Sequence, residues 1–414
     1  MTSRERVLAA VSHEQPDRVP VDLGATPSSG ISAIAYNNLK KLLGMSEGHT
    51  RVYDVVQELA QPEDEMIERY NIDVLDIGRV FNTADGDWHE TVLSDGSRAE
   101  YPAWFHPAEQ EDGNYFAYLD DGTFIAKKVK GATFFDQTLF PYIDGYPSDY
   151  EELPEAMGRV HWAALVHSPW DNTSKPHFWE DLRERALLLT QETDRAVLIV
   201  CGCNLFEWGT FLRRIDNFLM DLVLAKRDVE RLLDALMEQH LSVLAKVCDA
   251  VGDIVDIIRF GDDLGTDQGP FMSPELYRSL FKPRHRRLCN YVKRHSGMHT
   301  FLHSCGSIYK LIPDLIDAGF EILNPVQTNA RDMEPERLKR EFGKDVTFWG
   351  GGADTRAVLN KMTPREVKEH VKRRLEIFSP GGGFVFNPIH NILPDVPAEN
   401  IVAMFEAVRS FGNP

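Results

Sequence analysis

Residues 299–327, HTFLHSCGSIYKLIPDLIDAGFEILNPVQ, hold the pattern that decides the fold. Two short apolar runs, HTFLHSC and EILNPVQ, enclose a longer amphipathic segment with the residue spacing of a helix. A strand, a helix and a second strand in this order form the repeating unit of parallel sheets. We therefore expect this stretch to be one β-α-β unit of an α/β protein.

The same alternation of strand and helix extends over most of the chain. Eight apolar runs can be identified: RVPVDLG (18–24), VLDIGRV (74–80), AVLIVCG (196–202), DIVDIIRFG (253–261), HTFLHSC (299–305), EILNPVQ (321–327), VTFWGG (346–351) and GFVFNPIH (383–390). Strands that are nearly all apolar suit a parallel sheet that is buried on both faces, and eight strands followed by helices is the count of a TIM barrel. The sequence thus predicts the (β/α)8 TIM-barrel class. A doubly wound open sheet is the alternative, because periodicity does not distinguish the two.

The segment from about residue 83 to 145 has a different sequence pattern. Aromatic and β-branched residues are separated there by four Asp-Gly pairs, at 85–86, 95–96, 112–113 and 121–122. Asp-Gly between apolar stretches is a strong hairpin signal. We expect a single barrel domain over residues 1–414 that contains an inserted antiparallel β meander over residues 83–145.

Composition limits the partners and the compartment. The formal net charge of −19 repels polyanions, so we expect no nucleic-acid partner. The longest apolar stretch, AVLIVCGCNLF (196–206), is too short to cross a bilayer, so we expect no membrane association. Five cysteines scattered over 414 residues do not form a disulfide framework, and reduced thiols are expected. These features predict a soluble, cytoplasmic protein.

Chemically reactive side chains close several of the apolar runs. In a TIM barrel the C-terminal strand ends form the active-site face. His303 and Cys305 lie two residues apart on one strand and point the same way, so the imidazole and the thiolate can share one cation, and zinc accepts these ligands. His390 ends the last run and can supply a third ligand, which leaves a fourth position open. The alternative is that His303 and Cys305 are ordinary strand-end and core residues and that His390 is unrelated to them.

Three acidic residues are candidates for catalytic roles. Glu207 follows a strand end among aromatic residues, where desolvation would raise its pKa and suit it to proton transfer or metal ligation. Asp262 and Asp263 are paired acids in a glycine-bounded loop and could bind substrate, a metal or a proton. The alternatives are a helix-capping or salt-bridged glutamate and two aspartates that stabilise a turn.

Several longer motifs resemble the uroporphyrinogen decarboxylase superfamily, in particular its branch of corrinoid-dependent methyltransferases. They are LFEWGTFLRRIDNFLMDLV (205–223), GDDLGTDQGPFMSPELYRSLFKPRHRRL (261–288), FLHSCGSIYKLIPDLIDAGFEILNPVQ (301–327), FWGGGADTR (348–356) and GGGFVFNPIHNILPDVPAENIVAMFEAV (381–408). The resemblance covers the chain from about residue 190 to the C-terminus and is weaker before that point.

The resemblance implies a TIM barrel that holds zinc through a His-x-Cys pair and a later cysteine, and that exchanges methyl groups with cobalamin on a separate corrinoid protein. The His-x-Cys pair corresponds to His303 and Cys305. No cysteine follows Cys305, and His390 stands where the later cysteine would be expected. We therefore expect His303, Cys305 and His390 as metal ligands, with Glu207 as a fourth ligand or proton donor.

The expected function is transfer of a methyl group between a small O-, N- or S-methylated substrate and the cobalamin of a corrinoid protein. A homodimer is a possible assembly, since members of the superfamily often dimerise. The alternative is a metal-free decarboxylase of the uroporphyrinogen type. That alternative ranks second because DRVPVDLGATPSSGISAIAYNNL (17–39) lacks the arginine-rich motif that a substrate with many carboxylates would need. A binding barrel without catalysis is the third possibility.

Overall fold

The computed structural model describes residues 1–45, 47–164 and 167–411. Its centre is a parallel sheet of seven strands in the order β18-β17-β16-β15-β12-β11-β4. The strands are β4 (Val74–Asp76), β11 (Ala196–Gly202), β12 (Ile257–Gly261), β15 (His299–His303), β16 (Ile322–Asn324), β17 (Thr347–Trp349) and β18 (Phe384–Val385). Every strand pairs with its neighbour in chain order, as in a TIM barrel and unlike a doubly wound sheet.

The first predicted strand closes this sheet. Val21 forms a parallel bridge with Phe386, directly after β18. On its other side, the carbonyl of Val21 accepts a hydrogen bond of 2.8 Å from the amide of Asp73, directly before β4. The segment around Val21 therefore lies between the first and last strands of the sheet. The predicted TIM-barrel class is confirmed, and an open sheet is excluded.

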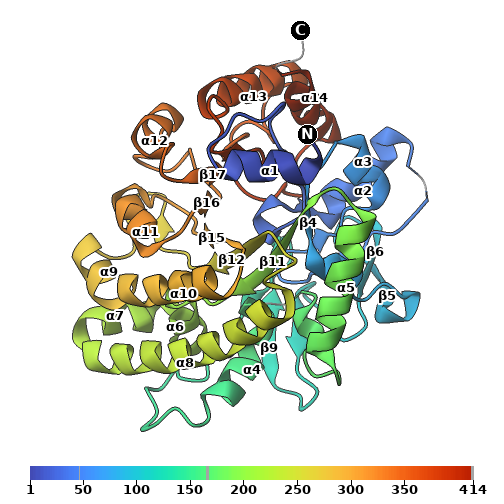
Figure 1. Cartoon of the computed structure of the whole chain (residues 1–414). Helices are drawn as coiled ribbons and strands as arrows, with labels where there is room; N and C mark the ends of the chain where they lie inside the picture. The colour runs from blue at the N-terminus through green and yellow to red at the C-terminus, as the bar shows by residue number, and fades with distance from the viewer. Residues whose placement is uncertain (46, 165–166, 412–414) are drawn as a thin grey trace.

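Helices follow the strands and surround the barrel (Figure 1). The helices are α1 (Ser3–Val11), α2 (Ala33–Leu43), α3 (Asp64–Arg69), α4 (Leu153–Ala164), α5 (Phe178–Glu192), α6 (Phe206–Arg213), α7 (Ile215–Leu224), α8 (Lys226–Val251), α9 (Pro274–Leu280), α10 (Lys282–His295), α11 (Ile312–Ala318), α12 (Pro335–Phe342), α13 (Pro364–Phe378) and α14 (Ala398–Ser410). Several begin at clear capping signals. At α13, for example, the Thr363 side chain accepts from the Glu366 amide, and Pro364 occupies the first turn.

The core has two parts, separated by the strands. Alternate strand residues such as Ile258, Phe260 and Leu302 face outward and pack with the helices in the larger apolar cluster. The intervening residues, including Ile257 and Phe301, face inward and form a smaller cluster inside the barrel. Val7, Ala10 and Val11 of α1 belong to this inner cluster, so α1 covers the N-terminal end of the barrel. The opposite, C-terminal end carries the polar residues.

Antiparallel strands occupy the region of the four Asp-Gly pairs. They are β5 (Trp88–Val92), β6 (Arg98–Pro102), β7 (Ala108–Glu109), β8 (Tyr115–Tyr118), β9 (Phe124–Lys128) and β10 (Asp136–Gln137). β5 pairs with β6, and β7 to β10 form a four-stranded sheet. The pairs at 95–96, 112–113 and 121–122 lie in the connections β5-β6, β7-β8 and β8-β9, as the hairpin signal predicts. The inserted antiparallel strands are thus present, whereas the subdomain limits of 83 and 145 stay a prediction.

Short strands complete the structure near the barrel. β1 (Ile31–Ser32), β2 (Val52–Asp54) and β3 (Leu59–Ala60) form a small antiparallel sheet, and β13 (Gly265–Thr266) pairs with β14 (Gly269–Pro270). All five cysteines are free thiols. Within the described ranges, none of the helices has both the length and the apolar character that crossing a membrane requires.

Candidate functional site

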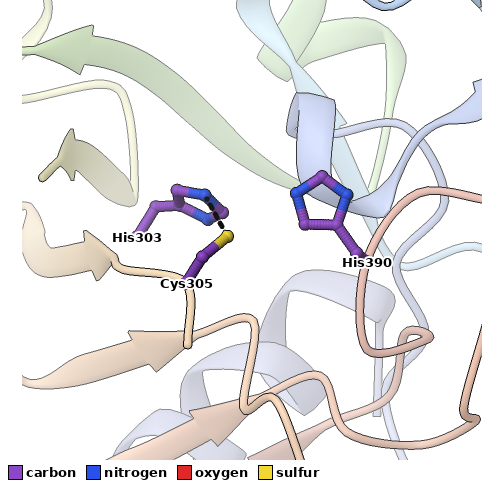
Figure 2. A group of neighbouring side chains, drawn as sticks. All are labelled: His303, Cys305 and His390. Atoms are coloured by element: carbon purple, nitrogen blue, oxygen red, sulfur yellow. Dashed lines mark hydrogen bonds between the residues drawn. The ribbon is translucent and has the colours of Figure 1, made fainter. Parts of the chain in front are cut away.

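His303, Cys305 and His390 come together at the C-terminal end of the barrel. His303 is the last residue of β15, Cys305 follows two residues later, and His390 lies in the segment after β18. One ligand atom from each lies within 4.8 Å of the other two. Figure 2 shows His303 and Cys305 side by side, with the His390 ring on the opposite side, from the segment after β18. These three candidate metal ligands are called the ligand triad below.

The geometry of the ligand triad suits a tetrahedral metal. Typical Zn–N and Zn–S bonds of about 2.0 and 2.3 Å place neighbouring ligand atoms of a tetrahedral site about 3.5 Å apart. The Cys305 Sγ and His303 Nε2 atoms are separated by 3.4 Å. The imidazole rings of His303 and His390 are 5.9 Å apart between centroids and are roughly perpendicular, so both can turn a nitrogen towards one ion. The nitrogen and sulfur donors therefore fit zinc.

Asn324 fixes the orientation of the His303 ring. Its Oδ1 atom lies 2.7 Å from His303 Nδ1, and the same oxygen accepts a hydrogen bond of 2.7 Å from Ser28 Oγ. Its Nδ2 group donates to the Trp349 carbonyl at 2.8 Å, which identifies the oxygen as the atom that faces the ring. An amide oxygen only accepts, so His303 Nδ1 must carry the proton. The Nε2 lone pair is then free for a metal, as in most histidine ligands.

The backbone conformation and close packing at position 306 explain why a glycine directly follows Cys305. Gly306 has a φ of +85°, a conformation that favours glycine. A Cβ atom on it would also lie 2.4 Å from the carbonyl carbon of Gly265. The loops after β12 and β15 therefore pack backbone against backbone, and the Ser307 amide donates to the Thr266 carbonyl at 2.7 Å. This close contact holds Cys305 next to the loop that carries Asp262 and Asp263.

In the absence of a bound metal, burial favours the uncharged forms of both residues of the His-x-Cys pair. Desolvation, and then the charges of Arg259 and His390, lower the pKa of His303 well below its usual value. Desolvation, followed by Asp263 and Glu207, raises the pKa of the Cys305 thiol well above its usual value. A neutral imidazole is ready to bind a metal, whereas the thiol must first lose its proton. Metal uptake at this site should therefore release a proton from Cys305.

Asp263 is the predicted acid that lies closest to the ligand triad. Its Oδ1 atom accepts a hydrogen bond of 2.8 Å from the Cys305 amide. The same oxygen is 3.5 Å from His303 Nε2, the nitrogen that is free for a metal. Asp263 thus orients the Cys305 backbone and presents a carboxylate beside the ligand atoms.

Glu207 lies one step further away, in the first turn of α6. Its Oε2 atom accepts hydrogen bonds from Asn204 Nδ2 at 2.5 Å and from the Asp263 amide at 3.1 Å. Desolvation, and then repulsion by Asp263 and Asp262, raise the pKa of Glu207 to about 8. At neutral pH this carboxyl group is therefore mostly protonated and can donate a proton.

Asp262 faces away from its neighbour Asp263. It is fully buried, and its Oδ1 atom accepts from the amides of Leu205 and Glu207 at the start of α6. Its Oδ2 atom lies 3.0 Å from His285 Nε2 on α10. These contacts connect β12 to two helices of the barrel wall. The structure thus brings Glu207 and Asp263 towards the ligand triad and gives Asp262 a contact set that holds α6 in place.

The raised pKa of Glu207 should make stability depend on pH. Between the usual pKa of about 4.5 and the folded value of about 8, the folded protein keeps a proton that the unfolded chain has lost. Stability contributed by protonated Glu207 is present at low pH and is lost as the pH rises towards 8. Glu207→Gln keeps the shape without the titration. We expect the Tm of this variant to equal that of wild type at pH 5 and to be about 2–4 °C higher than that of wild type at pH 9.

Thermal unfolding of both proteins at the two pH values checks this expectation. Glu376→Gln on the exposed face of α13 is the matched control, and its Tm difference should be the same at pH 5 and pH 9. An equal Tm difference at both pH values for Glu207→Gln would contradict the raised pKa.

Sequence reasoning missed two residues of this region, Asn324 and Arg259. Both occupy inward-facing positions of strands that were recognised only as apolar runs. The signal that could have identified them is the alternation of side chains along a strand. In β16, Ile322 and Asn324 share the inner face. In β12, Ile257 and Arg259 share it. A single polar residue in phase with inward-facing apolar residues points into the barrel.

Comparisons with known proteins agree with this architecture. A family model described as uroporphyrinogen decarboxylase (URO-D) matches residues 200–411, slightly more than half of the chain. The methylcobamide:CoM methyltransferase MtaA of Methanosarcina barkeri (strain Fusaro / DSM 804) is 25% identical over 177 residues, which are 42% of this chain and 48% of that protein. The chain therefore matches about half the length of this curated relative. A solved structure of a methyltransferase from Methanosarcina mazei superposes with a TM-score of 0.59 at 19% identity and covers 99% of both chains, which shows the shared fold.

Proposed function

The chain belongs to the uroporphyrinogen decarboxylase family, and from this premise we propose that it is a zinc-dependent methyltransferase. In this proposal a methyl group moves between a small O-, N- or S-methylated substrate and the cobalamin of a separate corrinoid protein. Both the curated relative and the solved structure are named methyltransferases, which supports this reaction over the decarboxylation that gives the family its name. The first of these names also refers to a methylcobamide, which supports a corrinoid partner.

The convergence of His303, Cys305 and His390 is the observation that carries the proposal. They would hold zinc as one thiolate and two neutral imidazoles, a donor set that leaves net positive charge at the ion. When bound, zinc supplies Lewis-acid activation of the heteroatom that carries or receives the methyl group. A metal-free decarboxylase offers no reason for a buried histidine with its Nε2 lone pair aimed at a cysteine sulfur.

The remaining polar residues have defined roles in this proposal. Asn324 orients His303, and Asp263 holds the Cys305 amide beside it. Glu207, mostly protonated at neutral pH, would return a proton to the heteroatom that loses its methyl group. Asp262 anchors the start of α6, on which Glu207 lies, and so acts by positioning. The corrinoid protein would dock over the C-terminal end of the barrel, where the ligand triad lies, and the free cysteines fit a cytoplasmic setting.

Metal content tests the ligand set directly. Elemental mass spectrometry of the purified wild-type protein should find about one zinc ion per chain for a three-ligand site. His390→Ala should bind zinc at least about tenfold more weakly, since one of three ligands is removed. His299→Ala, at the opposite end of β15, is the matched control and should bind zinc as the wild type does.

Two results would contradict the proposal. One is a wild-type protein that stays free of metal after incubation with zinc, which would restore the metal-free decarboxylase as the leading function. The other is unchanged zinc affinity in His390→Ala, which would remove this residue from the ligand set. If zinc binds as expected, the zinc-loaded protein should be assayed for methyl transfer to free reduced cobalamin. The change in the visible absorption of cobalamin reports this transfer.

A further inference from the structure

Arg259 places a positive charge without a bonded partner inside the barrel. It is the middle residue of β12, and strand alternation turns its side chain inward with Ile257, while Ile258 and Phe260 face the helices. Its register partners are Val200 on β11 and Phe301 on β15, both members of the inner apolar cluster. The guanidinium group therefore enters the interior between apolar neighbours, on the level directly below the residues at the barrel mouth.

The side chain has no bonded partner in the part of the chain that the structure describes. Arg259 is only 9% exposed, and its Nε atom is buried without a hydrogen bond. Buried charges in proteins are normally paired, because an isolated one loses its hydration without compensation. Arg6, by contrast, is equally buried and bonds to both Asp17 and Asp73. An unpaired buried guanidinium therefore suggests a ligand that supplies the missing partner.

Arg259 also lies within electrostatic reach of the ligand triad. Its register partner Phe301 comes two residues before His303 on β15, and Gly261, two residues after Arg259, is the register partner of His303. The acids whose charges act on Arg259 are Glu207 and Asp263, and neither forms a hydrogen bond or ion pair with it. Glu207 is mostly protonated at neutral pH. The hydroxyl group of Tyr53, which also interacts with the Arg259 charge, is a second buried polar group without a hydrogen bond. Arg259 Nε and the Tyr53 hydroxyl group are thus two buried donors without a hydrogen bond.

We propose that Arg259 binds a carboxylate group of the small substrate while the heteroatom that carries or receives the methyl group lies at the ligand triad. The planar guanidinium can form two parallel hydrogen bonds to a carboxylate, and such bonds are strong where water is excluded. The Tyr53 hydroxyl group can donate a further bond to the same carboxylate. This inference rests on the proposed methyltransferase function for the position of the heteroatom, and it narrows the substrate to molecules with a negative charge at one end.

A pair of thiols that differ only in charge tests the inference. Protein loaded with Co²⁺ in place of zinc reports thiolate binding through its charge-transfer absorption, without any turnover. We expect wild-type protein to bind 3-mercaptopropionate at least about tenfold more tightly than 3-mercaptopropan-1-ol. In Arg259→Met this preference should fall to about one, because the carboxylate then has no guanidinium partner. Arg356→Met, an exposed arginine that also lowers the pKa of His390, is the matched control and should keep the preference.

Stability separates this role from a purely structural one. Removing an unpaired buried charge should leave the Tm of metal-free Arg259→Met unchanged or higher, whereas a structural arginine would lower it. If Arg259→Met does not fold, Arg259→Lys, which keeps the charge without the two-pronged geometry, should show a reduced preference. Equal binding of the two thiols by wild type, or an unchanged preference in the Arg259 variants, would overturn the inference.

The two proposals fail in different ways. A protein that takes up neither zinc nor cobalt contradicts the methyltransferase function. Calorimetric titration of that metal-free protein with the same two thiols would still report the Arg259 site, because the charge preference does not depend on the metal. A metal-loaded protein without charge preference contradicts the carboxylate site alone.

Discussion

Under the proposed function, replacing Cys305 by serine should remove tightly bound zinc and lower the rate of methyl transfer by about a thousandfold or more. Serine has nearly the shape of cysteine, but its hydroxyl group does not supply a thiolate. Since Cys305 Sγ lies 3.4 Å from His303 Nε2, its loss leaves two imidazoles to hold the ion. The effect should be large because the thiolate is the one anionic donor of the ligand triad.

Zinc content, the Tm with and without zinc, and methyl transfer to cobalamin are the measurements. Ligand binding to the folded state raises the Tm, so zinc should raise the Tm of wild type and not that of Cys305→Ser. Without zinc, the free energies of unfolding of wild type and Cys305→Ser should differ by no more than about 1 kcal/mol, so their Tm values should be similar. Cys248→Ala on α8, outside the ligand triad, should keep both zinc and activity. Unchanged zinc content in Cys305→Ser would refute the predicted ligand set.

Replacing Trp349 by alanine should lower the free energy of unfolding by about 3–5 kcal/mol. Trp349 ends β17, is fully buried, and packs edge to face against Phe301 at 5.4 Å inside the barrel. Its indole N–H also donates to Asp22 Oδ2 at 2.8 Å. Burial raises the pKa of Asp22 to about 6, and the indole bond partly opposes this rise. The loss should therefore be larger at pH 8, where Asp22 is ionised, than at pH 5, where it is mostly protonated.

Chemical unfolding at both pH values separates the two contributions. Trp349→Phe keeps an aromatic ring beside Phe301 but removes the hydrogen bond and part of the ring volume, so it should cost about 1–3 kcal/mol, and more at pH 8 than at pH 5. Trp104→Ala is the matched control, because Trp104 is 45% exposed and should contribute less than about 1 kcal/mol. A loss in Trp349→Ala no larger than that of the control would show that the barrel interior tolerates a large cavity.

Much of the fold follows from local patterns. Short apolar runs alternating with amphipathic helices identified seven strands of the sheet, and Asp-Gly pairs located the hairpins. Strand lengths were less well predicted, since β18 contains only two residues although its apolar run continues to His390. Apolarity reports burial, and a buried segment beyond a strand end has the same composition as a strand.

Part of the ligand triad could also be predicted from a local sequence pattern. His303 and Cys305 lie two residues apart, so their convergence is a local property of an extended chain. The contribution of His390 depends on the barrel, which brings the last strand near β15 across the mouth, and on the turn after β18. The roles of the three predicted acids stay predictions, although their contacts now differ in a way that the sequence did not suggest.

The amino-acid sequence by itself determined the order of strands and helices, the inserted antiparallel strands and the His-x-Cys pair, because each depends on residues that are neighbours along the chain. Only the tertiary structure decided that Val21 closes the barrel against Phe386, which requires pairing between the two ends of the sequence. It also decided that Asp263 meets Cys305 while its neighbour Asp262 supports α6. Adjacent residues on a chain that leaves a strand point in opposite directions, and which one faces the site depends on register with β15, a long-range property that local patterns do not contain.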